Sequence, residues 1–394
     1  MPTPTPSDAQ QPPRLTLATA PTEPPAPRVA EFFAGIGLAR LGLESAGAQV
    51  VWANDFDPNK TVLYEAQFGA ADNHYVEQDI ATVTGDDVPD VDIAWSSFPC
   101  TDLSLAGQRR GLNGGTQSST FWQFTRIIEE MGDRKPAVIA LENVVGFATS
   151  HGGDDLAQAI KELNRLGYSV DVLTLDARRF VPQSRPRLFL IGALDAPDDF
   201  GDPGSELRPD WLQTPFGDPT LMTHRAALEA PPAPLTTGFS DLVERSGDWW
   251  DEARTRRFND SLSPVQFERL EILRKADRVV YRTAYRRTRN GVAVWEVRPD
   301  DIAGCLRTAR GGSSKQAVVR VGSGTVRVRW MTAREYARLM GAGEYNISTA
   351  RTSQSLFGFG DAVCVPAVGW LAEHYLVPLA EGTMRSDELT AVNV

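Results

Sequence analysis

The sequence predicts an α/β protein: a doubly wound parallel sheet with a second, smaller domain. Three observations support this fold class. From residue 28 onward, short apolar runs alternate with amphipathic segments, which is the pattern of a parallel sheet covered by helices. The alternation stops near residue 193, where a stretch rich in proline, aspartate and glycine begins. With 394 residues, the chain is long enough for two domains that each bury a core.

Four segments are expected along the chain. Residues 1–27 are rich in proline, alanine, threonine and glutamine, a composition that predicts a disordered tail. Residues 28–193 hold the main sheet. Residues 194–325 form the smaller domain. Residues 326–394 return to the main domain, because regular helical patterning resumes there.

In the main domain, turn residues separate the short apolar runs from the helices. Gly35 and Gly37 make the first turn, Pro58 suits the first turn of a helix, and Gly167 ends a later helix. The predicted strands are residues 29–33, 50–54, 75–76, 91–96, 137–141, 170–175 and 188–193. The predicted helices are residues 38–46, a segment after Pro58, 118–131 and 154–166. A loop, not a long helix, joins the last two strands.

After residue 193 the periodicity is weak until a basic segment begins. Residues 261–275 predict a helix, and residues 279–285 and 291–297 predict two strands joined at Arg289-Asn290-Gly291, a typical hairpin turn. Residues 332–340 and 366–379 predict the two helices of the C-terminal segment. Residues 195–234 give no clear pattern.

Cysteine and histidine usage argues against a metal site. Cys100, Cys305 and Cys364 lie far apart without a Cys-x-x-Cys pair, and the four histidines are scattered. We therefore expect no metal, a reducing cytoplasm, and packing roles for Cys305 and Cys364. No apolar stretch approaches the roughly 20 residues that span a bilayer, and the N-terminus lacks the layout of a signal peptide. No membrane association is expected.

A glycine-bearing turn follows the first strand. Its residues are Phe33, Ala34, Gly35, Ile36 and Gly37. Because a helix begins directly after them, their backbone N–H groups can face a carboxylate or a phosphate. Asp55 ends the second strand, where its carboxylate can accept hydrogen bonds from both hydroxyls of a ribose. Asp79 ends the third strand, where it can accept a hydrogen bond from an adenine amino group. The turn alone also suits a nicotinamide dinucleotide, but Arg40 occupies the position of that motif's third glycine.

Four reactive or charged residues follow the turn in chain order: Cys100, Glu142, Arg185 and Arg187. A thiolate that adds to carbon 6 of a pyrimidine makes carbon 5 nucleophilic toward a methyl donor. The charge that develops on the ring requires a proton at nitrogen 3, which a carboxylic acid can supply. We assign Cys100 as the nucleophile, Glu142 as the proton donor and Arg185 as the cation that supports both. Taken singly, Cys100 also suits a packing role and Glu142 a helix-entry carboxylate.

These motifs, in this order, resemble those of the DNA cytosine-5 methyltransferase family. The resemblance extends from residue 29 to residue 379, apart from residues 193–298, where this family keeps a variable target recognition domain. The matching stretches are residues 33–37 for the cofactor, 99–100 for the nucleophile, 142–144 for the acid, 183–187 for the arginines, 307–312 with 332–340 for the brace of the recognition domain, and 359–363 for completion of the cofactor pocket.

The resemblance implies a class I S-adenosylmethionine-dependent methyltransferase, with a Rossmann-like doubly wound sheet and a smaller target recognition domain. The implied reaction transfers a methyl group from S-adenosylmethionine to carbon 5 of a cytosine in a specific duplex DNA sequence, by covalent thiolate addition at carbon 6 with base flipping. The implied catalytic residues are Cys100, Glu142, Arg185 and Arg187. The implied cofactor-binding residues are Phe33, Ala34, Gly35, Ile36, Gly37, Asp55, Phe56, Asp79, Ile80, Pro99, Asp361 and Ala362.

Duplex DNA is the expected partner, although the formal net charge is −11. Phosphate contacts dominate DNA affinity, and residues 251–330 contain 18 Lys and Arg against 9 Asp and Glu, so one basic face remains available. The same arginines would also suit a solvated helical face. A hairpin can enter the major groove, where arginine reads guanine. The expected DNA-binding residues are Ser104, Gln183, Arg286, Arg287 and Arg289.

Two other functions compete with this interpretation. One branch of the family methylates a cytosine in transfer RNA, but its characteristic Cys-Phe-Thr stretch is absent and the long basic insert favours DNA. A non-catalytic DNA-binding protein would not need Cys100 and Glu142. The chain departs from the family at Thr101, at Asp361 and in the loop 113–120. We expect a prokaryotic, cytoplasmic, nucleoid-associated monomer in a restriction-modification, phage or epigenetic setting.

Overall fold

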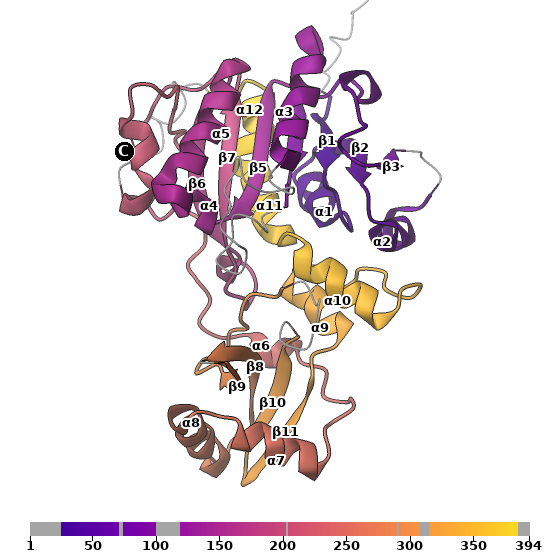
Figure 1. Cartoon of the computed structure of the whole chain (residues 1–394), viewed down its shortest axis with the longest axis vertical. Coiled ribbons are helices and arrows are strands. Elements are labelled where there is room, and N and C mark those ends of the chain that lie inside the picture. Colours follow the sequence, from indigo (N-terminus) through magenta and orange to yellow (C-terminus); the bar gives the residue numbers. More distant parts are fainter. Residues whose placement is uncertain are drawn as a thin grey trace, which may run out of the picture.

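The computed structural model describes residues 25–70, 74–99, 119–201, 204–289, 291–307 and 315–384. Figure 1 shows two bodies, a larger one around a seven-stranded sheet and a smaller one around a four-stranded sheet. The C-terminal helices, in yellow, lead from the junction back into the larger body. The predicted disordered tail lies almost entirely outside the described residues.

The larger sheet confirms the predicted doubly wound fold. Its strand order is β3-β2-β1-β4-β5-β7-β6. All neighbours are parallel except β7, which runs antiparallel to both β5 and β6. The strands are β1 (Arg28–Phe32), β2 (Gln49–Asp55), β3 (Tyr75–Glu77), β4 (Ile93–Ser96), β5 (Val138–Val144), β6 (Ser169–Asp176) and β7 (Pro186–Ala193). Because the order reverses between β1 and β4, a crevice is expected beyond their carboxyl ends.

Helices cover both faces of this sheet, so the residues of both orientations in its strands are mostly apolar. In β1, Val29 packs with α1 (Leu38–Ser45) and α11 (Val365–Leu371), whereas Ala30 and Phe32 pack with α3 (Ser119–Glu130) and α5 (Asp154–Arg165) on the other face. Glu31 has the same side-chain direction as Val29, so a carboxylate lies on the α1 face. A strand buried on both faces is the reason the sequence showed near-continuous apolar runs.

Several predicted helix signals are used as expected. Helix α2 (Pro58–Phe68) has Pro58 in its first turn and Asp57 as its N-cap, whose side chain accepts a hydrogen bond from Asn59 N. Helix α9 (Ala333–Leu339) begins with a capping box between Thr332 and Glu335. The remaining helices of the larger body and its C-terminal return are α4 (Gly146–Thr149), α10 (Thr352–Asp361), η7 (Ala372–Leu376) and α12 (Val377–Ala380).

The smaller body is an antiparallel sheet in the order β11-β10-β8-β9. Its strands are β8 (Val280–Arg289), β9 (Val292–Val297), β10 (Ala317–Gly322) and β11 (Thr325–Trp330). The β8-β9 hairpin confirms the predicted one. The β10-β11 hairpin was not predicted, and it carries the sheet five residues past the expected boundary at 325. Helix α7 (Glu252–Asp260), also unpredicted, and helix α8 (Pro264–Lys275) pack on one face through an apolar cluster that includes Phe258 and Leu270.

The segment without clear periodicity runs along the edge strand β6. Backbone hydrogen bonds join Thr174 N to Leu207 O at 2.8 Å and His224 N to Val170 O at 3.3 Å. Arg208 and Asp171 form a fully buried ion pair, with the closest approach 2.5 Å. The short helices of this segment and its continuation are η5 (Asp210–Leu212), η6 (Thr214–Gly217) and α6 (Phe239–Leu242). Tertiary contacts, not local periodicity, therefore fix this part of the chain.

The C-terminal return contains one run that is long and apolar enough to span a membrane by length and composition alone. It covers Thr352–Ala380, and 67% of its most apolar window is buried inside the molecule. Within it, α11 and η7 pack against α1 in the main core. A buried core helix passes the same compositional test, so the run is explained by packing.

Candidate active site

Three residues of the glycine turn after β1 have a left-handed backbone conformation. Phe33, Gly35 and Gly37 all have positive φ angles of 56°, 59° and 74°. A Cβ atom on Gly37 would lie 2.4 Å from Phe68 Cε2 and 2.8 Å from Tyr64 Cε2, so no side chain fits there. The turn is tied to β2 by the hydrogen bond from Ala34 N to Asn54 O at 2.8 Å.

Asp55 holds this turn from the end of β2. Its Oδ2 accepts a hydrogen bond from Gly35 N at 2.9 Å, and its Oδ1 accepts from Phe56 N at 2.8 Å and from Asp57 N at 3.0 Å. Lys60 Nζ lies 3.5 Å from Oδ2, which is the longest of the four contacts. The predicted ribose contact of Asp55 would most readily replace this last one, because the three backbone donors belong to the turn itself.

Two adjoining cavities meet at the turn. The first, of about 300 Å³, and the second, of about 270 Å³, share Phe33, Asp55, Phe56 and Pro99 in their linings. The predicted cofactor residues in the first lining are Phe33, Ala34, Gly35, Ile36, Asp55, Phe56, Pro99, Asp361 and Ala362. Asp79 and Ile80 line the second cavity. Gly37 lines neither and instead caps α1.

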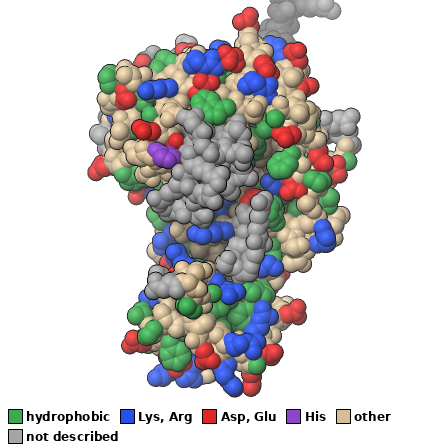
Figure 2. All heavy atoms as spheres, viewed as in Figure 1, with side chains coloured by type: hydrophobic (Ala, Val, Ile, Leu, Met, Phe, Trp, Pro, Cys, Tyr) green, Lys and Arg blue, Asp and Glu red, His purple; other side chains and the backbone are tan. Residues whose placement is uncertain are grey.

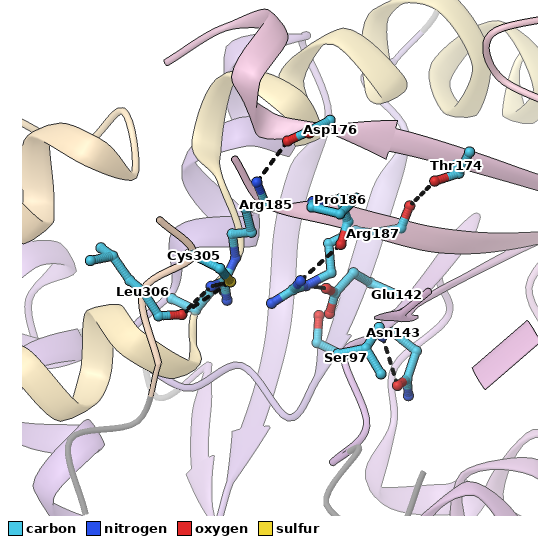
Figure 3. A network of polar contacts seen from close by, with 12 residues as sticks. Ser97, Glu142, Asn143, Thr174, Asp176, Arg185, Pro186, Arg187, Cys305 and Leu306 are labelled. Atoms are coloured by element: carbon cyan, nitrogen blue, oxygen red, sulfur yellow. Dashed lines mark hydrogen bonds and ion pairs between the residues drawn. The ribbon is translucent and has the colours of Figure 1, made fainter. Parts of the chain in front are cut away.

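Glu142 and Arg187 meet in the first cavity. Glu142 lies on β5 and Arg187 on β7, and Arg187 Nε is 2.8 Å from Glu142 Oε1 (Figure 3). Glu142 is buried, with 7% of its surface exposed. Next to it, Asn143 Nδ2 donates to Phe98 O at 3.2 Å, which anchors the segment that leads through Pro99 to Cys100. Asn143 belongs to the predicted acid motif, residues 142–144, but no role was predicted for it.

Arg185 makes no direct contact with Glu142 among the described residues, so any support that it gives the acid, as predicted, acts through its charge. Its buried guanidinium donates to Leu306 O at 2.8 Å and Ala362 O at 2.6 Å, with longer contacts to Cys305 Sγ and Gly360 O (Figure 3). Burial, followed by the charge of Arg187, lowers the pKa of Arg185. Arg185 therefore joins the segment before β10 to the end of α10, and Arg187 is the arginine paired with the acid.

Cys305, predicted as a packing residue, lies close to several arginines that influence its thiol. Its Sγ is 3.3 Å from Arg185 Nη1. Burial acts to raise the pKa of the Cys305 thiol, but the charges of Arg185, Arg187 and Arg307 outweigh it and the net shift is downward. For Cys364, by contrast, burial outweighs the lowering effects of a backbone hydrogen bond and of Arg185 and Arg187, and it raises the pKa to about 12, as suits a packing residue.

Gln183 was predicted to contact DNA, and the structure corrects this. Its side chain is fully buried. Its Nε2 donates to Leu339 O at 2.7 Å, and its Oε1 accepts from Leu306 N at 3.0 Å. With both ends of the amide satisfied inside the protein, Gln183 joins α9 to the segment before β10, and no side-chain atom is left for DNA.

The arginines of the β8-β9 hairpin point to different faces. Arg286 stacks on Trp295 at 5.9 Å, on the face that α7 and α8 cover. Arg287 lies on the opposite face, pairs with Glu296 at 3.2 Å, and keeps 53% of its side chain exposed. The side chain of Arg289, together with Cys100 and Ser104, lies outside the described residues. Figure 2 shows Lys and Arg side chains over the smaller body and at the junction.

Besides Asp57, two further charged residues line the first cavity and were not predicted. Glu31 is 1% exposed, and burial raises its pKa to about 8. Among the described residues, its Oε2 has no hydrogen-bond partner. A carboxylate inside the apolar run Val29-Ala30-Glu31-Phe32 was a readable signal. Lys60 is the second. Within the described ranges, no group of three His, Cys, Asp or Glu could hold a metal ion.

The sheet with its antiparallel β7 and the cavity beyond β1 and β4 define a class I S-adenosylmethionine-dependent methyltransferase fold. Solved structures share it. The Schizosaccharomyces pombe Dnmt2 methyltransferase aligns with a TM-score of 0.57 and 19% identity, covering 89% of this chain and 98% of its own. The Entamoeba histolytica methyltransferase EhMeth aligns at 0.54 and 12%, covering 91% and 98%.

Residues 27–376 match the family described as C-5 cytosine-specific DNA methylase, and the chain belongs to that family. Among curated relatives, the type II methyltransferase M.Bsp6I of Bacillus sp. (strain RFL6) is 34% identical over 168 residues, 42% of this chain and 51% of the relative. M.HhaI of Haemophilus parahaemolyticus is 35% identical over 165 residues, 42% and 48% respectively. These matches span about half the length of each relative.

Proposed function

We propose that this chain transfers a methyl group from S-adenosylmethionine to carbon 5 of a cytosine within a specific duplex DNA sequence. One observation carries the proposal. A single cavity is lined by the glycine turn, by the Glu142–Arg187 ion pair, and by Pro99, the residue before Cys100. A cofactor site and a proton donor therefore share one space. Family membership supports the reaction class.

The lining of this cavity suits S-adenosylmethionine. Five of its lining residues are acidic, Glu31, Asp55, Asp57, Glu142 and Asp361, against two cations. Such a balance favours a ligand that carries a sulfonium and an ammonium group. Burial raises the pKa of Glu31 to about 8, so this residue is largely protonated at neutral pH, a state that a bound cation would reverse. The unpartnered Glu31 Oε2 is an acceptor suited to the ammonium group. Phe56 is 66% exposed and offers a ring face to the adenine, with Asp79 and Ile80 nearby in the second cavity. When bound, the cofactor supplies an electrophilic methyl group.

The protein's own residues would activate the base as follows. The thiolate of Cys100 adds to carbon 6 of cytosine, while Glu142 protonates nitrogen 3. After methylation at carbon 5, the proton on that carbon passes to water, the bond to Cys100 breaks with its electron pair returning to the sulfur, and nitrogen 3 returns its proton to Glu142. Arg187 fixes the direction of the Glu142 carboxylate through the 2.8 Å contact. Arg185 acts at a distance, by holding the segment at Leu306 and the end of α10 together.

Recognition is assigned to the smaller body. Cytosine carbons 5 and 6 are not both accessible in a stacked duplex, so the target base must be flipped into the cavity. We assign target recognition to residues 194–325 and their continuation in β11, with residues 28–193 and the C-terminal segment as the catalytic part. The named type II relatives favour a prokaryotic restriction-modification setting. We also propose a cytoplasmic, nucleoid-associated enzyme that acts on duplex DNA as a monomer.

The decisive experiment concerns Cys100. A duplex containing 5-fluorocytosine at the target position should form a covalent adduct with the wild-type protein and none with Cys100→Ser, because a serine hydroxyl is hardly ionised. Calorimetry should show the variant binding S-adenosylmethionine as tightly as the wild type. Bisulfite sequencing of host DNA with and without the gene would give the target sequence.

Two outcomes would overturn the proposal. An adduct with a cytosine in transfer RNA, without one in DNA, would identify the RNA-methylating branch. DNA binding without any adduct or methyl transfer would identify a non-catalytic binding protein.

A further inference from the structure

Lys60 joins two distant parts of the chain at the mouth of the first cavity. It is the third residue of α2, and its Nζ lies 3.5 Å from Asp55 Oδ2 and 3.8 Å from Asp361 Oδ2. Asp361 is the last residue of α10, more than 300 positions later. The Lys60 side chain is 17% exposed, and all three residues line the cavity.

Neither helix gains from these charges. Lys60 sits in the first turn of α2, where the helix dipole disfavours a cation, and Asp361 sits in the last turn of α10, where it disfavours an anion. A partly exposed ion pair contributes only about 0–1 kcal/mol to stability. The local electrostatics of the two helices therefore give no reason for a lysine at this position, and its surroundings in the cavity supply one.

The cavity needs a cation if it is to admit a carboxylate. Five of its lining residues are acidic, and of its two basic residues Arg187 is paired with Glu142. Lys60 is the other. Its contact with Asp55 is the weakest that this carboxylate makes, because three backbone N–H groups at 2.8–3.0 Å hold Asp55 without it. The ammonium group can therefore turn to a ligand while the glycine turn stays intact.

We propose that Lys60 binds the carboxylate of the amino-acid part of S-adenosylmethionine, with Asp55 and Asp361 as its partners in the absence of a ligand. This rests on the proposed function, since it assigns a subsite within the same cavity. Lys60 then favours the binding of cofactors and analogues that keep their carboxylate.

Calorimetry with three ligands tests the assignment. Lys60→Met should weaken S-adenosylmethionine about tenfold to a hundredfold, the range for a lost hydrogen bond between charged groups. It should leave unchanged the affinity for decarboxylated S-adenosylmethionine and for methylthioadenosine, which lack the carboxylate. Lys60→Arg should restore most of the affinity for S-adenosylmethionine, and Lys161→Met, on the exposed side of α5, should change nothing.

Each result has a distinct meaning. Equal losses for all three ligands would show that Lys60 only shapes the cavity, and unchanged binding of S-adenosylmethionine would show that it has no part in the site; either overturns the assignment. A wild-type protein that does not bind S-adenosylmethionine would overturn the proposed function as well. Thermal unfolding of each variant checks the fold, and Lys60→Gln replaces Lys60→Met if the latter is unstable.

Discussion

Glu142 meets Arg187 because β5 and β7 are neighbours in antiparallel register, with Val144 opposite Arg187. Residues diagonal to one another across such a pair share a face, so the two side chains converge over the cavity. The guanidinium Nε takes one carboxylate oxygen, Oε1. Thr174 Oγ1 donates to Arg187 O at 3.0 Å, which holds the arginine's own backbone. The acid is thus oriented from two strands.

Replacement of Glu142 by Gln should separate chemistry from binding. The amide can still hydrogen-bond the edge of the base but cannot deliver a proton, so the methyl-transfer step should slow about a hundredfold or more. Duplex DNA affinity should change little. Single-turnover methylation and fluorescence anisotropy measure the two quantities, with Glu65→Gln on the exposed surface of α2 as a control. Normal turnover with lost DNA binding would make Glu142 a positioning residue.

Arg185 and Arg187 show how far the contacts of single residues could be predicted from the sequence. Their types and spacing predicted a cationic group near the acid. Which arginine reaches Glu142 depends on the pairing of β5 with β7, and the 43 residues between Glu142 and Pro186 carry no local sign of that register. Gln183 was misplaced for the same reason, because its partners Leu306 and Leu339 are more than a hundred residues away.

At the scale of elements, the strands of the larger sheet were predictable because burial on both faces makes them apolar throughout. The second hairpin of the smaller body was not. Its strands alternate valine with arginine, as in Val326-Arg327-Val328-Arg329, and Gly322-Ser323-Gly324 forms its turn. Those signals were present, but the predicted boundary at 325 divided the hairpin between the smaller domain and the returning segment. Helix α10 was hidden likewise, since its glycines lower helix propensity while Gly358 allows close packing on Ile36.

The β8-β9 hairpin gives opposite expectations for adjacent arginines. Arg287→Ala should relax the methylated sequence at one position, because Arg287 is exposed on the face opposite α7 and α8. Arg286→Ala should keep the sequence and lower stability by about 0.5–1 kcal/mol, the worth of its cation–π contact with Trp295. Sequencing of methylated sites and thermal unfolding measure the two effects. If Arg287→Ala keeps the wild-type motif, recognition lies in other residues of the smaller body.

Across the whole molecule, a buried polar network fastens the segment after β7 to the sheet and to the C-terminal helices. His224 is 3% exposed, with Ser169 Oγ and Tyr375 OH each 3.0 Å from its ring nitrogens. Tyr375 donates to Asp171, which also pairs with Arg208. Burial lowers the pKa of His224, despite the nearby charge of Asp171. The folded protein therefore favours the neutral imidazole.

The lowered pKa of His224 predicts how the stability of the folded protein changes in acid. As the pH falls below about 6.5, the unfolded chain takes up a proton at this histidine before the folded protein does, so the free energy of unfolding decreases. The limiting slope is about 1.4 kcal/mol per pH unit. The fall between pH 7 and pH 5 should be smaller in His224→Gln, as urea denaturation of both proteins would show. Glu31 acts in the opposite direction but equally in both, so the difference isolates His224. Parallel curves would contradict this account.

The first cavity is formed by residues that lie far apart in the sequence. The Tyr345 hydroxyl lies 2.7 Å from Ile36 O and 2.8 Å from Leu63 O, and Asp361 and Ala362 form a wall of the first cavity. A ribosome adds roughly 5–20 residues per second, so the glycine turn emerges on the order of ten or more seconds before its wall. Throughout that interval the nascent chain lacks a wall of the first cavity, so the cavity cannot form before residues 361 and 362 have been synthesised.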